Sequence, residues 1–445
     1  FRSLLAGQQL VGQGEALSFT NPVTGKVVEF GAGAAGTTPT VSITGAGNAA
    51  VTLAANNTLK GLNLATTLGS QTALSDGNGT VGTLTVSNVD ISGSGMAVDI
   101  DQGGALNVVI DSLSSSASTQ QGVQLAATGA ALTGTFTVTA GSISGATGVG
   151  FLVGDGAGLA NTGGAVAISY GGTVTSGGNA AAVFITDRVA NAGDITLSGN
   201  INRTAGSADA IKIDDLATGA TVRFSGNLDI ATTSGTGIAI TNNNGAVHFT
   251  GGQVTVNTGS GTGVNITGGT GATTFNLSGN DLDIVSTAGG TGFSAADAGT
   301  VTVLGDGNTI AATGGVALSV VNSKMGAPGL KFASISSSNA SSGIVLDTTG
   351  TQGGLTVTGT GAAGTGGTIS GATGAAAIVA TNTQDLQLAW MNITSPSGHG
   401  IAATNLRGSN ALANSEISGF GMGVGNGEDG LRVVNTNTNM TGMTV

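Results

Sequence analysis

The sequence predicts an all-β protein built as a parallel β-helix, a solenoid in which each coil of short strands stacks on the next. Three observations support this prediction: a phrase that recurs about every 27 residues, a period-two alternation of apolar residues inside each repeat, and 82 glycines among 445 residues. Self-similarity at a period of roughly 20–50 residues is the signature of repeat architectures.

The recurring phrase is a small residue, usually glycine, followed by alternating apolar residues. From Gly95 to Gly423 it spans 328 residues in 12 intervals, which gives a mean period of about 27 and about 16 coils for the whole chain. Its occurrences begin at Gly95, Gly122, Gly148, Ala182, Ala210, Gly237, Gly263, Gly292, Gly315, Gly343, Ala377, Gly400 and Gly423.

The repeat at 237–262 shows the expected elements in order. Turns at Asn242–Gly245 and at Gly251-Gly252 separate three alternating stretches, and Asn and Gly tolerate the positive φ that tight turns require. Alternation of β-branched residues indicates strands, so each coil is expected to hold three short strands. The residues expected to point inward are Ile238, Ile240, Val247, Phe249, Val254 and Val256.

Competing architectures fit the pattern less well. Immunoglobulin-like sandwiches need roughly 100 residues per unit, and propeller blades repeat at about 40–50 residues. Strong helix formers are scarce, and only Leu4–Leu10 is expected to be helical, as a cap. Residues 1–38 are expected to form an entry or capping segment with the first coils, and residues 39–445 the β-helix, which continues beyond Val445.

Three stretches near the start carry a family resemblance. Gln8–Leu17 resembles the entry turn of right-handed parallel β-helix repeat proteins from bacterial cell surfaces, and Pro39–Ile43 and Val51–Leu64 look like their first coils. In composition and period, nearly the whole chain also resembles passenger segments of autotransporter-type adhesins. The resemblance implies a large exported protein used for adhesion or as surface structure. With the general crossover preference of parallel strands, it also implies a right-handed coil.

Composition excludes several classes of function. The absence of cysteine excludes a disulfide scaffold, a thiolate metal site and a cysteine nucleophile. Eleven Lys and Arg against 23 Asp and Glu, without a basic cluster, argue against a nucleic-acid partner. No apolar run approaches the roughly 18 residues of a membrane span. Phe1 at the start and an unfinished strand pattern at Val445 suggest a window from a longer chain.

Paired carboxylates are the first candidates for chemistry, because glycoside hydrolysis needs two of them about 5–10 Å apart. Asp99 and Asp101 are expected to share the solvent side of one strand, since Val98 and Ile100 fill the core. Further pairs are Asp214 with Asp215, Asp281 with Asp283, and Glu428 with Asp429.

A second cluster combines Lys212 with Asp214, Asp215 and Arg223. A lyase would use such a base beside acidic groups. We expect instead that this cluster is an exposed ion pair that contributes less than about 1 kcal/mol to stability.

Histidine and tryptophan give weaker signals. His399 lies in a Gly-His-Gly match that pectin-cleaving hydrolases combine with an Asp-Asp pair, but it follows Asp214 by 185 residues, or about seven coils. At about 4.8 Å per coil this exceeds roughly 30 Å, too far for a proton relay. His248 is expected to point outward. Trp390 and Met391 are expected to belong to the core and its flank rather than to a ligand-binding platform.

Several acidic turns have oxygen ligands that suit calcium. They are Asp76–Gly79, Asp155-Gly156, Asp306–Asn308 and Asn426–Gly430. The tandem nonapeptide of calcium β-rolls is absent, and Asp, Asn and Gly are ordinary turn residues. No cofactor is therefore predicted, and bound calcium is left as an alternative.

These patterns predict a non-enzymatic extracellular surface protein, a rigid β-helical rod serving adhesion or filament or surface-layer structure, with no catalytic, cofactor or metal residue. Expected partners are other copies, end to end or laterally, because β-helix ends leave open strand edges; glycans and other surface proteins are also possible partners. One alternative is a carbohydrate-active enzyme using Asp99, Asp101, Lys212, Asp214 and Asp215. Another is a glycan-binding module or viral fibre.

Overall fold

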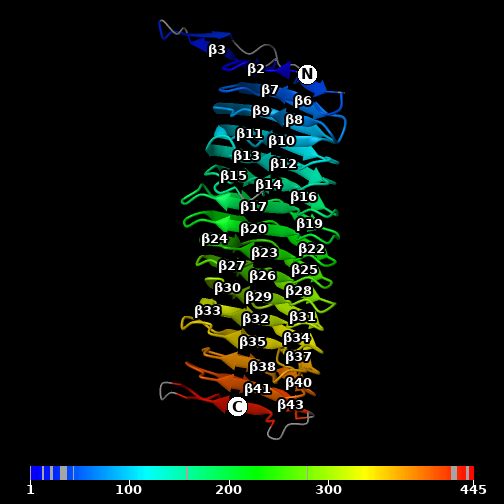
Figure 1. The fold of residues 1–445 in the computed structure, drawn as a ribbon, viewed down its shortest axis with the longest axis vertical. Coiled ribbons are helices and arrows are strands. Elements are labelled where there is room, and N and C mark those ends of the chain that lie inside the picture. The colour runs from blue at the N-terminus through cyan, green and yellow to red at the C-terminus, as the bar shows by residue number, and fades with distance from the viewer. Residues whose placement is uncertain are drawn as a thin grey trace. The chain divides into compact units, whose positions relative to one another are not determined.

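The computed structural model describes residues 2–12, 15–20, 24–30, 38–43, 45–156, 159–277, 279–421, 428–436 and 440–445. The regular structure of these residues is entirely β, and the chain forms a parallel β-solenoid with about 27 residues per turn (Figure 1). The predicted fold class is confirmed. The chain comprises two compact units, unit 1 (Phe1–Asn200) and unit 2 (Ile201–Val445).

In unit 1, one face of the coil is a parallel sheet that receives one strand from each turn. Its strands are β1 (Arg2–Ser3), β6 (Ala49–Thr52), β8 (Thr72–Ser75), β10 (Met96–Ile100), β12 (Val123–Leu125), β14 (Phe151–Val153) and β17 (Val183–Arg188). The other faces contain β2 (Gln9–Val11), β5 (Thr40–Ile43), β7 (Thr58–Thr66), β9 (Thr83–Gly93), β11 (Gly104–Ser115), β13 (Leu132–Ser144), β15 (Ala167–Tyr170), β16 (Thr173–Ser176) and β18 (Ile195–Leu197).

Unit 1 also shows how a face is divided. The long strand β13 pairs with β15 through its first half and with β16 through its second, so one bent strand corresponds to two strands of the next turn. Apart from the coil, β3 (Leu17–Thr20) and β4 (Val27–Phe30) pair antiparallel as a hairpin.

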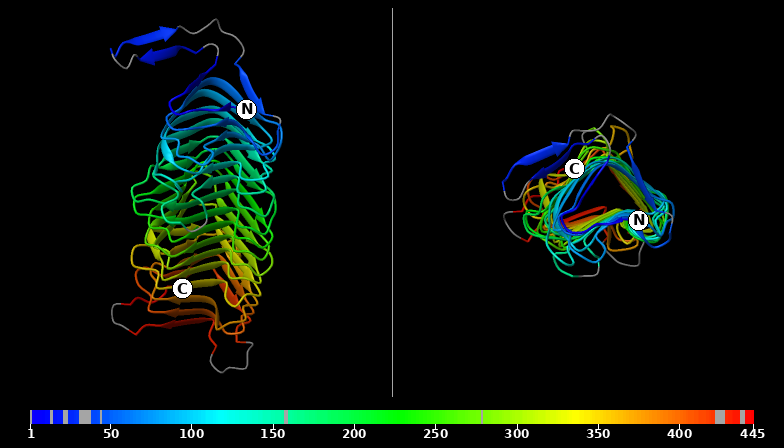
Figure 2. Two further views of the ribbon diagram at one scale, coloured as in Figure 1. Left: turned by 45° about the horizontal axis from the view of Figure 1, so that its top comes forward. Right: turned by 90° about the horizontal axis from the view of Figure 1, so that it is seen from above.

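In unit 2 each turn contributes a strand to each of three faces, the triangular outline seen along the coil in Figure 2. The first face holds β20 (Ile211–Leu216), β23 (Ile238–Thr241), β26 (Val264–Thr267), β29 (Phe293–Ala296), β32 (Leu318–Val321), β35 (Ile344–Asp347), β38 (Ala376–Thr381), β41 (His399–Thr404) and β44 (Leu431–Val434). The second holds β21 (Thr221–Phe224), β24 (Ala246–Phe249), β27 (Ala272–Asn276), β30 (Thr300–Leu304), β33 (Lys324–Phe332), β36 (Leu355–Val357), β39 (Gln387–Ala389) and β42 (Ala411–Ala413). The third holds β19 (Ile201–Arg203), β22 (Leu228–Thr232), β25 (Val254–Thr258), β28 (Leu282–Ser286), β31 (Thr309–Thr313), β34 (Ser334–Ser338), β37 (Gly367–Ser370), β40 (Met391–Thr394) and β43 (Glu416–Ser418).

The core of unit 2 is a set of ladders in which equivalent inward residues stack from turn to turn. One ladder, fully buried at every step, is Ile211, Ile238, Val264, Phe293, Leu318, Ile344, Ile378 and Ile401. The six residues predicted to point inward from 237–262 are all buried, at most 1% exposed. Parallel pairing in register therefore puts like side chains in contact, and burial of apolar area stabilises the coil.

A column of left-handed residues forms one corner of unit 2, directly after the first-face strands. Its φ values lie between 48° and 70° at Asn242, Gly268, Asp297, Asn322, Thr348, Asn382 and Asn405. Asn, Asp and Gly adopt this conformation most readily. The Asn242 N–H donates to the Thr267 carbonyl at 2.8 Å, so the corner also continues the hydrogen bonding between turns. The predicted Asn-rich turn is confirmed.

One expectation is wrong. Leu4–Leu10 contains no helix: Gln9–Val11 is strand β2, paired with β7, and the Leu4 N–H donates to Thr52 at 2.9 Å. Pairing with the next turn satisfies this backbone better than a short isolated helix, which is marginal on its own. The sheet that receives one strand from each turn holds seven strands in unit 1 and nine in unit 2 among the described residues, which agrees with the expected count of about 16 coils.

The boundary placed between residues 38 and 39 stays a prediction. In the described part of the first 38 residues, β1 and β2 already pair with coil strands β6 and β7. Gln13 and Gly14, two of the residues behind the family resemblance, lie outside the described residues.

We predict that Phe249→Ala lowers the free energy of unfolding by about 3–5 kcal/mol. The Phe249 ring stacks on Phe224 at 5.1 Å and on Phe275 at 4.4 Å between centroids, so truncation leaves a cavity in the middle of a ladder. Urea denaturation followed by circular dichroism measures the loss. Phe249→Leu, which keeps most of the volume, should cost clearly less; equal costs would contradict the ladder as the source of stability.

Candidate functional site

The most unusual polar cluster lies in unit 1, where two candidates from separate sequence patterns come together. Asp76 follows β8, and Asp99 lies on β10 of the next turn, where it is the register partner of Ser75. The Asp76 N–H donates to the Asp99 carbonyl oxygen at 2.9 Å. Parallel pairing thus places the acidic turn at Asp76 beside the Asp99 and Asp101 pair.

The three carboxyl groups differ in how deeply they are buried. Val98 and Ile100 are fully buried, as predicted, and Asp99 and Asp101 lie on the outward side but only partly exposed. Asp76 is 3% exposed. One of its oxygens, Oδ2, accepts a hydrogen bond from the Gln102 N–H at 2.8 Å, whereas Oδ1 has no hydrogen-bond partner among the described residues.

This environment favours the protonated carboxyl groups. Burial raises the pKa of Asp76 to about 7, with smaller contributions from the charges of Asp101 and Asp99, and the Gln102 N–H opposes the shift. Burial also raises the pKa of Asp99 to about 6, assisted by the charge of Asp101. A buried carboxylate without full hydrogen bonding is costly, so the cluster holds a proton near neutral pH.

The cluster suits proton retention better than catalysis on a polymer. A general acid must lie within hydrogen-bond reach of the atom it protonates, and Asp76 is almost completely covered. Among the described residues no three or more His, Asp or Glu side chains are placed to hold one metal ion.

The second predicted cluster is an ion pair at the surface. Lys212 Nζ lies 3.6 Å from Asp214 Oδ2, with side-chain exposures of 36% and 23%. Asp215 occupies a left-handed corner, with φ 51°. Arg223 lies on β21, where its register partner is His248 of the next turn. The geometry agrees with the expected surface ion pair, of the kind worth less than about 1 kcal/mol.

His399 is far from the Asp214-Asp215 pair, as predicted. Six first-face strands separate β20 from β41, which at about 4.8 Å per step exceeds roughly 30 Å. The His399 Nδ1 instead accepts from the Asp429 N–H at 2.8 Å, and its Nε2 lies 3.3 Å from Arg432 Nη1. His399 therefore connects β41 to the next turn. Asn426 and Gly427 of the calcium candidate before Asp429 lie outside the described residues.

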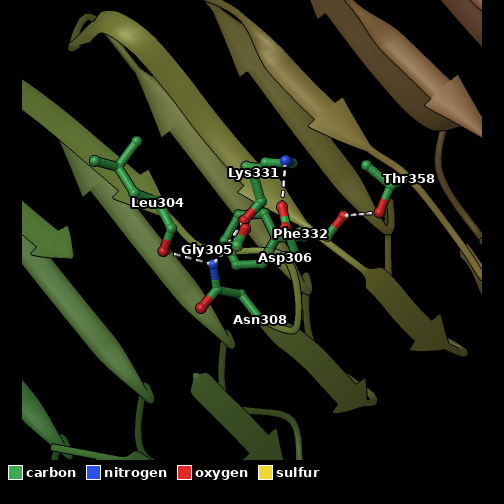
Figure 3. A network of polar contacts seen from close by, with 7 residues as sticks. All are labelled: Leu304, Gly305, Asp306, Asn308, Lys331, Phe332 and Thr358. Atoms are coloured by element: carbon green, nitrogen blue, oxygen red, sulfur yellow. Dashed lines mark hydrogen bonds and ion pairs between the residues drawn. The ribbon is translucent and has the colours of Figure 1, made fainter. Parts of the chain in front are cut away.

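The acidic turn at Asp306–Asn308 uses its polar atoms to hold neighbouring turns together. Asn308 is fully buried, and its Nδ2 donates to the carbonyls of Leu304 at 3.0 Å and Lys331 at 2.9 Å (Figure 3). Its Oδ1 accepts from the Leu282 N–H at 2.8 Å, and Asp306 pairs with the Lys331 ammonium. In this turn the Asn308 amide and the Asp306 carboxylate are thus engaged by protein groups of the neighbouring turns.

Sequence reasoning missed a buried arginine. Arg188, at the end of β17, is 2% exposed and donates to the carbonyls of Gly163, Val166 at 2.7 Å and Gly193 at 2.8 Å. Burial lowers its pKa to about 10. The side chain braces the wide turn before β15. The sequence pattern gives no signal for it, because an arginine at a strand end usually faces solvent.

Trp390 and Met391 differ from each other in burial. Met391 is 1% exposed and belongs to the core. Trp390 is only partly buried and fills a one-residue corner between β39 and β40 with φ 59°. A bulky residue in this region is a conformational outlier. The prediction of core and flank therefore holds for Met391, whereas Trp390 is a corner residue.

In comparisons with known proteins, no family model, no curated protein and no solved structure matches the chain. In the described part of the chain, no helix is long and apolar enough to cross a membrane.

We predict that Asp76→Asn stabilises the protein at pH 8 and has little effect at pH 4. The folded-state pKa of about 7 lies above the ordinary value of 3.8, so the folded protein binds a proton that the unfolded chain has lost. Stability from this group is therefore complete below about pH 4 and falls as pH rises through about 7. The neutral amide removes that loss, worth on the order of 2–4 kcal/mol.

Urea denaturation at both pH values measures the effect. Asp90→Asn is the matched control, because Asp90 is an exposed carboxylate on β9. Equal stability of the Asp76→Asn variant and the parent at pH 8 would contradict a buried protonated carboxyl.

Proposed function

We propose that this chain is a non-enzymatic extracellular surface protein whose stiff β-solenoid serves adhesion or the structure of a filament or surface layer. The observation that supports the proposal is the alternation of buried apolar residues and outward polar residues along each strand. On β25, Val254 and Val256 are buried, while Thr255 and Asn257 face outward. The apolar ladders stiffen the coil, and the outer faces present hydroxyl and amide groups.

Such faces suit polar, extended partners. Hydroxyl and amide groups donate and accept hydrogen bonds, and a repeat of about 4.8 Å per turn presents them at regular intervals. Glycans, other surface proteins and further copies of this chain are the partners we propose. An origin on a bacterial surface, in the manner of autotransporter-type adhesins, belongs to the same proposal and rests on the resemblance in composition and period.

Immunogold electron microscopy of the native material tests the proposed location. We expect label on the cell envelope, over filaments, ordered layers or straight projections, because a coil with polar faces is suited to spacing and contact. Cells lacking the protein are the control. Label confined to the cell interior would contradict the proposal.

A carbohydrate-active enzyme is the second candidate, and the raised pKa of Asp76 and Asp99 is the observation that favours it. The burial of Asp76 argues against it. We therefore expect reducing-sugar release from acidic and neutral polysaccharides to stay at background at pH 5–8, with no difference between the parent and Asp99→Asn. Release that Asp99→Asn abolishes would establish the enzyme instead.

A further inference from the structure

We propose that a small cavity on the third face of unit 2 binds one sugar ring of a glycan. The cavity has a volume of about 220 Å³ and lies over β40 and β43. Its floor follows an outward column in which Thr368, Asn392 and Glu416 are register partners on successive turns. This inference rests on the proposed adhesive function and names the chemistry of one contact.

The cavity exists because one turn is longer than its neighbours. Nine residues, 358–366, connect β36 to β37, whereas Trp390 alone connects β39 to β40. The longer turn supplies Ala363 and Gly364 as one wall, and the corner residues Asn414 and Ser415 supply the opposite wall. A recess bounded on two sides results.

The longer turn is braced in place. The Thr365 hydroxyl donates to the Ala362 carbonyl at 2.6 Å and accepts from the Thr360 N–H at 2.9 Å. Trp390 lies against the same turn, since a Cβ added at Gly359 would come within 2.7 Å of the Trp390 Cβ. Trp390 adopts its unfavourable left-handed conformation here, and such strain is concentrated at functional sites. We regard Trp390 as a positioning residue for the wall.

Two amides in the cavity have unused hydrogen-bonding capacity. The Asn392 Oδ1 has no partner among the described residues and is shielded from solvent, so the amide must rotate to expose this oxygen before a ligand donor can satisfy it. The Asn414 side chain is exposed at the rim. The Ser415 hydroxyl, by contrast, is already used: it accepts from the Met391 N–H and donates to the Ala413 carbonyl, both at 2.9 Å. Glu416 adds an exposed carboxylate.

This set of groups selects the ligand class. A carboxylate accepts hydrogen bonds, and each Asn amide both accepts and donates. Adjacent hydroxyl groups of a sugar match both roles, whereas an ammonium group donates only and leaves the amide N–H groups unpaired. Small-molecule sites usually measure roughly 300–1,000 Å³, so a cavity of about 220 Å³ fits a single ring rather than an oligosaccharide.

Saturation-transfer NMR of the full chain with a panel of methyl glycosides of neutral and N-acetylated hexoses tests the proposal. We expect at least one glycoside to receive saturation. Asn392→Ala and Glu416→Ala should each weaken its binding about tenfold, the effect of losing one ligand hydrogen bond. Asn265→Ala is the matched control, because Asn265 is an outward amide on β26 of the first face.

Three outcomes overturn the proposal: no glycoside of the panel binds, the Asn265→Ala and Asn392→Ala variants bind alike, or methylammonium displaces the glycoside and binds more tightly. Circular dichroism and urea midpoints confirm that each variant is folded. Envelope labelling with a failed glycoside test would overturn the sugar site alone. Interior labelling with a successful test would overturn the surface function alone.

Discussion

Backbone pairing between one turn and the next is the interaction on which the rest of this structure depends. Each strand uses its N–H and C=O groups on the turns before and after it, so the register of one turn sets the register of its neighbours. Because side chains on a strand alternate in direction, a correct register places every apolar ladder inside. The eight fully buried residues from Ile211 to Ile401 are the direct result.

The same constraint decides where polar residues are allowed. Corners must turn the chain without losing the hydrogen bonds between turns, and the column that includes Asn242, Asn322 and Asn405 does both. Side chains that cannot face solvent need full hydrogen bonding, which Asn308 and Arg188 achieve with carbonyl groups. Asp76 achieves it only in part, and its pKa rises as a consequence.

The irregular turns give this solenoid the features that do not repeat from coil to coil. The longer turn at 358–366 supplies one wall of the recess beside Asn392. The bulky Trp390 in a left-handed corner belongs to the same irregularity. In our proposal the repetitive coil supplies stiffness along its length, and a single altered turn supplies a ligand contact at one point.

The sequence by itself determined the solenoid class, the period and the inward residues of the repeat at 237–262, because alternation and turn residues act within a few residues of the chain. It also indicated that Lys212 and Asp214 lie on one strand face and that His399 is remote from them. Only the tertiary structure decided the strand at Gln9–Val11, the burial of Asp76 beside Asp99, and the cavity at Asn392. These features depend on which residues of successive turns become neighbours, and each wide turn shifts that correspondence by an amount that a local pattern does not contain.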